Sequence, residues 1–140
     1  FGGGLSLARG MEVSGLAAWI GGVVAALGAV PPIVVVLVVA TLIVFLTEVT
    51  SNTAAATVAM PSVAGAARGP GVDPPLPMAA VALSASMTFM LPVATPSNAM
   101  VFASGYVTIP QMSRVGFWLN LISIATITLL GNLLVGIFLT

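Results

Sequence analysis

Charged residues are nearly absent from this sequence. Only 4% of its 140 residues are charged, whereas 59% are hydrophobic and the mean hydropathy is +1.23. A soluble domain carries about 25% charged residues, because it needs polar groups to cover its surface. The composition therefore excludes an ordinary soluble domain and predicts an all-α integral membrane protein that crosses the lipid bilayer more than once. The charged residues are Arg9, Glu12, Glu48, Arg68, Asp73 and Arg114.

Cysteine and histidine are absent altogether. Their absence excludes disulfides, thiolate chemistry, most zinc sites and a histidine general base. An intramembrane protease would need a Ser–His pair or two aspartates, and the only aspartate in the sequence is Asp73. We therefore expect the protein not to be an enzyme. The net charge is zero, so nothing suggests nucleic acid as a partner.

The start of the chain lacks an initiator methionine and a basic leader, because it begins Phe1-Gly2-Gly3-Gly4. We therefore expect the chain to be part of a longer protein. Four segments are predicted along it. They are a glycine-rich entry with an interfacial or arm helix over 1–28, a re-entrant hairpin with a surface loop over 29–75, a broken transmembrane helix over 76–112, and a last transmembrane helix over 113–140.

The apolar run over 33–67 contains a polar stretch at its middle. The run follows a chain break at Pro31-Pro32, and its polar stretch is Thr47-Glu48-Val49-Thr50-Ser51-Asn52-Thr53. Polar groups at this density are costly in hydrocarbon unless they line a cavity or contact protein. The pattern predicts a helical hairpin with arms over 33–49 and 54–67 and a tip over 50–53. The residues that follow, 68–75, are rich in Pro and Gly and predict a surface loop.

Glu48 is the only charged residue in this apolar run, so a functional role is the default hypothesis. It lies near the end of a predicted helix. Pairing with another part of the full protein and protonation are both alternatives there. Because a carboxylate repels an anion, we do not expect Glu48 to contact an anionic substrate.

A second apolar stretch, 76–109, is interrupted by Leu91-Pro92-Val93-Ala94-Thr95-Pro96-Ser97-Asn98. Two prolines four residues apart remove two backbone donors and clash with the preceding turn. We expect the helix to open over 91–98 and to restart near Ser97. The carbonyl near Pro92 is expected to stay free, because Pro96 has no N–H to donate to it. The apolar run over 115–139 predicts a last span, with Asn120 and Asn132 facing protein.

Two interrupted apolar segments in one short chain are typical of a transport site. The N-terminus of each restarting helix offers unpaired N–H groups, which attract a carboxylate or a phosphate. Each break also carries Ser, Thr and Asn, and hydroxyls together with opened carbonyls suit a sodium ion. The same residue types join membrane helices to one another. A structural membrane subunit is therefore the alternative from another functional class.

Four motifs occur in an order typical of one transporter family. They are Gly2-Gly3-Gly4-Leu5-Ser6-Leu7-Ala8, Glu12-Val13-Ser14-Gly15-Leu16, Thr47-Glu48 ahead of Ser51-Asn52-Thr53, and the stretch from Leu91 to Ala99. On these residues the chain resembles the divalent anion–sodium symporter family. The resemblance implies a multi-pass protein of the cell (inner) membrane that carries di- and tricarboxylates, or in some members sulfate, with sodium as the co-transported ion. It also implies a homodimer with an elevator mechanism, in which this chain is the second inverted repeat and the N-terminal half of the same transporter supplies the first.

The same resemblance implies the residues of the site. Those expected to contact the substrate are Ser51, Asn52, Thr53, Thr95 and Pro96. Those expected around one sodium ion, partly through backbone carbonyls, are Thr47, Thr50, Asn52 and Ala94. An arsenite or citrate carrier of the wider ion-transporter group would share the broken helices and stays an alternative. The sequence leaves open which anion is carried and whether protons replace sodium.

Overall fold

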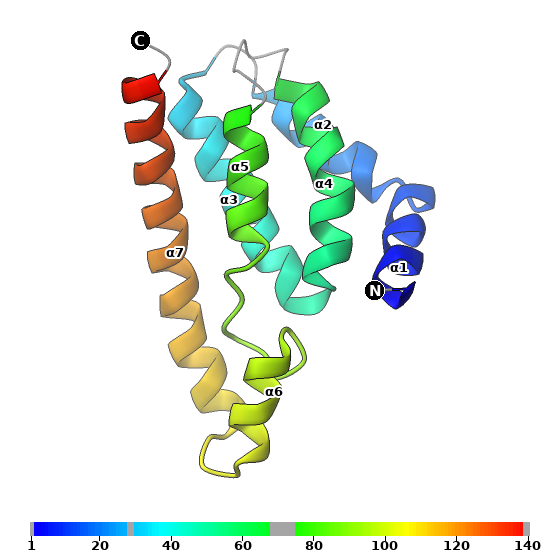
Figure 1. Ribbon diagram of the computed structural model, residues 1–140, viewed down its shortest axis with the longest axis vertical. Helices are drawn as coiled ribbons and strands as arrows, with labels where there is room; N and C mark the ends of the chain where they lie inside the picture. The colour runs from blue at the N-terminus through cyan, green and yellow to red at the C-terminus, as the bar shows by residue number, and fades with distance from the viewer. Residues whose placement is uncertain (1, 28–29, 68–74, 139–140) are drawn as a thin grey trace.

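The regular secondary structure of the described residues is all helix. The computed structural model describes residues 2–27, 30–67 and 75–138, and over these ranges it contains seven helices and no strand (Figure 1). Within the same ranges two helices, Pro32–Val49 and Ile109–Leu133, are long and apolar enough to cross a membrane, by length and composition. The all-α fold class predicted from the sequence is confirmed.

Helices α1 (Gly2–Val13) and α2 (Leu16–Ala26) form an arm at one side of the molecule (Figure 1). The corner between them is Gly15, whose φ of 82° is a left-handed conformation that glycine adopts at little cost. The sequence predicted a glycine-rich entry with an interfacial or arm helix over 1–28. The entry itself is helical in the structure, and the corner divides the predicted helix in two.

Helices α3 (Pro32–Val49) and α4 (Asn52–Ala67) lie beside each other and are joined at one end (Figure 1). Proline is tolerated in the first turn of α3, because an N–H there has no partner within the helix. The two helices match the predicted arms. Only residues 50 and 51 lie between them, so the tip is shorter than the predicted 50–53. The predicted surface loop falls almost wholly on 68–74, outside the described residues.

The second apolar stretch divides into α5 (Pro75–Ser84) and α6 (Pro96–Ala103), separated by the unwound segment 85–95. The predicted opening over 91–98 is therefore wrong in extent. The helix ends eight residues before Pro92, so the prolines alone do not account for the break. Helix α6 begins at Pro96, close to the predicted restart. Helix α7 (Ile109–Phe138) begins earlier than the predicted apolar run and follows the whole length of the molecule (Figure 1).

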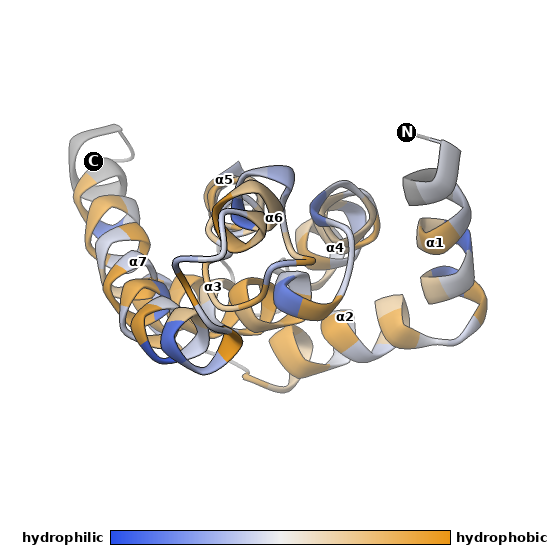
Figure 2. Cartoon of the chain, turned by 90° about the horizontal axis from the view of Figure 1, so that it is seen from below, coloured by the Kyte–Doolittle hydropathy of each residue, from blue (hydrophilic) through white to orange (hydrophobic). Residues whose placement is uncertain are grey.

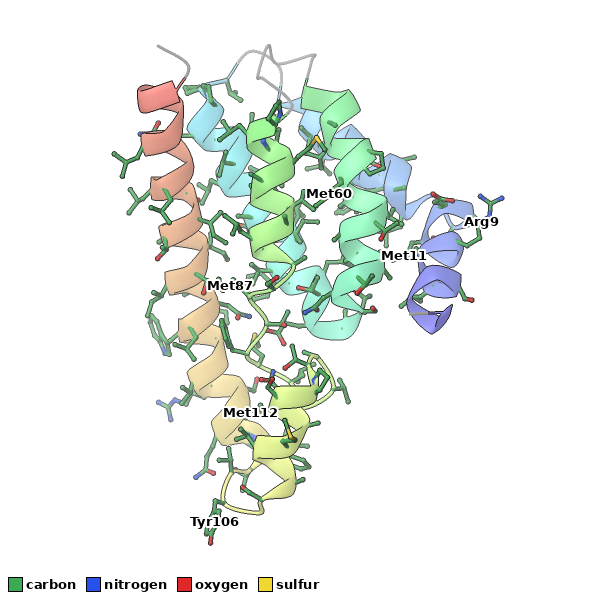
Figure 3. All side chains as sticks on the ribbon, in the orientation of Figure 1. Arg9, Met11, Met60, Met87, Tyr106 and Met112 are labelled. Atoms are coloured by element: carbon green, nitrogen blue, oxygen red, sulfur yellow. The ribbon has the colours of Figure 1, made fainter. Side chains whose placement is uncertain are left out.

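Helix α3 is the centre of the packing. It contacts α4, α5 and α7, while α4 also contacts α1 and α2. Met60 and Met87 are partly buried against this core (Figure 3). The buried apolar residues of α3 are Val35, Val36, Val39, Ala40, Ile43 and Val44.

Helix α7 turns many large apolar side chains outward. Trp118 is 63% exposed, Ile122 60% and Leu129 62%. Figure 2 shows that hydrophobic colours dominate the outer faces of the helices, with few hydrophilic residues. Such a surface is suited to contact with lipid or with further protein rather than with water.

Candidate functional site

Two hydroxyls lie where α3 ends, that of Thr47 buried and that of Thr50 half-buried. Thr47 is fully buried, and its hydroxyl donates to the carbonyl of Ile43 at 2.8 Å. The hydroxyl of Thr50 donates to the carbonyl of Leu46 at 2.8 Å. In both side chains the proton is directed back along the helix. Their oxygen lone pairs therefore stay available to accept a hydrogen bond or to coordinate a cation.

Asn52 is the first residue of α4, and it reaches across to the unwound segment. Its Nδ2 donates to the hydroxyl of Thr88 at 3.4 Å. Its Oδ1 is buried, and no donor within the described residues reaches it. A buried amide oxygen without a donor is costly, and it is a suitable ligand for a cation.

Thr88 joins the two helix N-termini. Its hydroxyl accepts from Asn52, while its backbone carbonyl accepts from Nδ2 of Asn98 at 3.1 Å. Asn52 opens α4, and Asn98 lies in the first turn of α6. The structure therefore brings the hairpin tip and the second break together. Thr88 is 1% exposed and was not singled out in the sequence, because a lone Thr in an apolar run has no distinctive signal.

The start of α6 has ordinary helix-capping geometry. The hydroxyl oxygen of Thr95 accepts from the backbone N–H of Asn98 at 3.1 Å, which makes Thr95 the N-cap. Pro96 is the first residue of the helix, where the missing N–H would have had no partner. The missing N–H of Pro96 therefore costs nothing in the open helix, and the role of Pro96 in keeping the helix open stays a prediction.

The carbonyls of the break are also not all free. Nδ2 of Asn98 donates to the carbonyl of Leu91 at 3.1 Å as well as to that of Thr88. The Asn98 side chain therefore donates hydrogen bonds to two carbonyls of the unwound segment. Over the described residues no donor is found on the Ala94 carbonyl, which leaves that oxygen available at the break.

Glu48 is buried among hydrogen-bond donors. Its Oε1 accepts from the N–H of Phe89 at 2.8 Å and of Met90 at 3.0 Å, and its Oε2 accepts from Met90 at 3.1 Å and from Leu91 at 3.2 Å. Nδ2 of Asn120 donates to Oε1 at 2.7 Å. The partners of Glu48 could not be predicted from the sequence. They lie in this chain, in the unwound segment and in α7. Asn120 faces protein as predicted, whereas Asn132, for which the same was predicted, is exposed among the described residues.

The residues predicted from the sequence differ in their exposure. Ser51, Ala94 and Thr95 are half-buried, and Thr53 and Pro96 are exposed. The Ser51 side chain accepts a long bond of 3.4 Å from the N–H of Ala54. These five residues are thus at least partly accessible rather than enclosed in the core.

A hollow of about 600 Å³ lies nearby, between the break, α6 and the first turns of α7. It is lined mainly by apolar side chains, and of the polar residues at the break it includes only Asn98. It does not include Asn52 or Thr95. Its lining residues are Phe89, Asn98, Val101, Tyr106, Val107, Gln111, Met112, Val115, Gly116 and Leu119.

Comparison with known proteins finds transporters. The sodium-dependent dicarboxylate transporter SdcS of Staphylococcus saprophyticus is 47% identical over 135 residues, which make up 96% of this chain and 26% of that protein. SdcS of Staphylococcus aureus strain USA300 is 49% identical over 129 residues, 92% of this chain and 25% of that protein. The chain thus spans about a quarter of the length of these curated relatives.

A match to a whole family extends over more of the chain than either relative does. The family described as the sodium:sulfate symporter transmembrane region matches residues 1–139. This range contains the hairpin tip, the unwound segment and all of α7. The chain therefore belongs to the sodium:sulfate symporter transmembrane family.

Proposed function

We propose that this chain is the second half of the binding site of a symporter that carries di- or tricarboxylates with sodium. The observation that carries the proposal is the meeting of two helix N-termini at Thr88, beside a buried Asn52 oxygen that receives no donor from the part of the chain that the structure describes. The names of the relatives, sodium-dependent dicarboxylate transporters, support the choice of substrate and of ion.

The anion would be held between the hairpin tip, residues 50 and 51, and the start of α6. The first N–H groups of α4 and α6 carry partial positive charge, and a carboxylate gains about 0.3–1 kcal/mol from each helix terminus when exposed and more when partly buried. The side chains proposed to contact it are Ser51, Asn52, Thr53, Thr95 and Pro96. A substrate with two carboxylates would use this half of the site for one of them and the N-terminal half of the transporter for the other.

One sodium ion would lie on the other side of Asn52. Its proposed ligands are oxygen atoms of Thr47, Thr50, Asn52 and Ala94, and the Asn52 oxygen is the one whose unpaired state the ion would relieve. Asn52 would then serve both ligands, with Nδ2 directed to the break and Oδ1 to the ion. Binding of sodium and of anion would be coupled through this one side chain.

The hairpin is proposed to be re-entrant. Its tip is polar and only two residues long, and its helix α4 has 16 residues, fewer than the roughly 20 that a span needs. The wider proposal is an elevator transporter of the cell membrane, a homodimer whose N-terminal half contributes the first repeat. Irregular backbone at membrane depth is tolerated where protein buries it or a cavity receives it.

Two alternatives keep some support. A carrier of arsenite or of citrate would use the same broken helices with a different anion. A structural subunit would need no unpaired Asn52 oxygen, and that atom favours a binding role over it.

The test uses the full-length transporter, purified and reconstituted in vesicles. We expect uptake of labelled succinate that requires a sodium gradient and fails with potassium. Thermal stabilisation by succinate, malate, citrate and sulfate, each with and without sodium, identifies the anion. Stabilisation by none of the four, or equal stabilisation in potassium, would contradict the proposal.

A labelling experiment tests the re-entrant hairpin. This chain has no native cysteine, so single cysteines at Ile33 and Ala66 can be placed in a full-length transporter whose other cysteines have been removed. We expect a membrane-impermeant maleimide to reach both positions from the same side of a sealed vesicle. Two complete spans would also return the chain to that side, so a third single cysteine is placed at Val49, an exposed residue beside the tip. Labelling of Val49 at the opposite surface would mean that α3 and α4 are two spans, and labelling of Ile33 and Ala66 from opposite sides would mean a single crossing.

A further inference from the structure

The unwound segment 85–95 is held from two sides by residues outside the proposed site. Glu48 of α3 accepts from three consecutive backbone N–H groups, those of residues 89 to 91. On the other side, Gly116 of α7 lies directly against the same backbone. A Cβ at this position would be 2.6 Å from Met90 Cα and closer still to the Phe89 carbonyl. Asn120 lies one helical turn beyond Gly116, on the same face of α7, and donates to Glu48.

These contacts explain why the segment is unwound at all. In a continued α5 helix, the N–H groups of 89 to 91 would bond to carbonyls four residues earlier. Three successive N–H groups directed at one anion form an alternative arrangement, and a buried carboxylate makes it strong. Glu48 is 3% exposed and Asn120 is fully buried, so water does not compete for these bonds. The carboxylate therefore favours the open backbone over the helix.

The same stretch of backbone determines where the proposed ligand groups lie. Thr88, immediately before the clamped residues, receives Asn52 on its hydroxyl and Asn98 on its carbonyl. The carbonyl of Leu91, the last clamped residue, also accepts from Asn98. A displacement of 89–91 would move the Asn52 contact and the start of α6 together.

We propose that Glu48, Gly116 and Asn120 are positioning residues, a clamp that fixes the unwound segment so that the hairpin tip and the start of α6 stay in register for sodium and the anion. Helix α7 supplies no ligand to the proposed site, yet it sets the geometry of that site through Gly116 and Asn120. This inference rests on the proposed function.

The test compares three single variants of the full-length transporter, Glu48→Gln, Gly116→Ala and Asn120→Ala, with one control variant. Glu48→Gln keeps the side-chain shape but presents an NH₂ group to donors. Gly116→Ala adds one carbon against the Phe89 carbonyl. The control is Gly65→Ala in α4, where an added Cβ meets nothing within 4 Å. Asn120→Ala alone and combined with Glu48→Gln gives a double-mutant cycle.

Two readouts are required. The first is amide hydrogen exchange of residues 89–91, which we expect to accelerate at least about tenfold in Glu48→Gln, because the variant keeps only one acceptor oxygen for three N–H groups and replaces the other with an NH₂ donor. The second is the sodium concentration at half-maximal succinate uptake. We expect Glu48→Gln and Gly116→Ala each to raise it about tenfold or more, since a displacement of about 1 Å in a positioned group has large effects. Gly65→Ala should leave both the exchange rate and the sodium concentration unchanged. The effects of Asn120→Ala and Glu48→Gln on these readouts should not be additive in the double variant.

A purely structural role would lower the melting temperature and the amount of folded transporter without moving the sodium concentration at half-maximal rate. Wild-type sodium dependence in both Glu48→Gln and Gly116→Ala would overturn the inference. If Gly116→Ala does not reach the membrane, Glu48→Gln decides with the exchange measurement. Asn52→Ala is included to separate the clamp from the proposed function. Normal uptake in Asn52→Ala contradicts the proposed site. If Asn52→Ala loses uptake while Glu48→Gln and Gly116→Ala keep wild-type sodium dependence, only the clamp is contradicted.

Discussion

Replacing Asn52 with alanine should remove ligand binding without destabilising the unliganded protein. The bond from Nδ2 to Thr88 is long, at 3.4 Å, and an ordinary neutral hydrogen bond contributes only about 0.5–1.5 kcal/mol. The Oδ1 atom is buried without a donor, which costs about 1–3 kcal/mol. The two terms oppose each other. We therefore expect the free energy of unfolding without ligand to stay within about 1 kcal/mol of wild type, or to rise.

Bound ligand should raise the stability of the wild type but not that of Asn52→Ala. A ligand present at 100 times its dissociation constant stabilises the native state by about 2.7 kcal/mol. Sodium with succinate should thus raise the melting temperature of the wild type, and the rise should be lost in Asn52→Ala. The measurement is the melting temperature of the purified full-length transporter in sodium or potassium, with and without succinate.

Asn132→Ala is the matched control, because Asn132 is an exposed asparagine on α7, away from the tip. It should keep the full stabilisation by ligand. Two results would refute the reasoning. One is a ligand-induced rise in Asn52→Ala equal to that of the wild type. The other is a loss of several kcal/mol in the unliganded variant, which would mean that Asn52 holds the fold together.

Three further predictions concern the start of α6. Pro96→Ala should leave the break open and change sodium activation of uptake by no more than about twofold, because Pro96 occupies a position whose N–H is unused; a larger shift would restore a role for the proline. Thr95→Ala should cost about 1 kcal/mol of stability and weaken succinate affinity, whereas Thr95→Ser, which keeps the cap, should retain both in thermal-shift titrations. Asn98→Ala should lower the melting temperature without ligand, because the Thr88 carbonyl loses its donor at a cost of about 1–3 kcal/mol, whereas the Leu91 carbonyl keeps the N–H of Ala94 at 3.2 Å; an unchanged melting temperature would argue that the Thr88 carbonyl needs no donor.

Helix ends could be predicted from the sequence where a local residue determines them. Pro31 and Pro32 mark the start of α3, and Pro96 marks the start of α6. The polar tip separates α3 from α4 because Thr50 and Ser51 follow a long apolar run. In each case the deciding residue lies within one turn of the boundary, so a reading along the chain finds it.

The extent of the second break could not be predicted in this way. Its unwinding depends on Glu48, which is 41 to 43 residues away from the N–H groups that it binds. Asn120 is 72 residues from Glu48. The close approach at Gly116 likewise needs the position of α7 in space. Local helix propensity carries no information about such contacts. The two prolines, Pro92 and Pro96, therefore predicted only the second half of the unwound segment.

The contacts of Glu48 also bear on the order in which this protein can enter a bilayer. The segment 85–95 exposes backbone N–H and carbonyl groups that hydrocarbon cannot satisfy, each at a cost of several kcal/mol. Its acceptor, Glu48, is synthesised before it, and the donor Asn98 directly after it. Asn120 and Gly116 arrive last, with α7. During synthesis the broken helix can therefore insert only against an α3 that is already in place, and the buried carboxylate acquires its full set of donors only when α7 has docked.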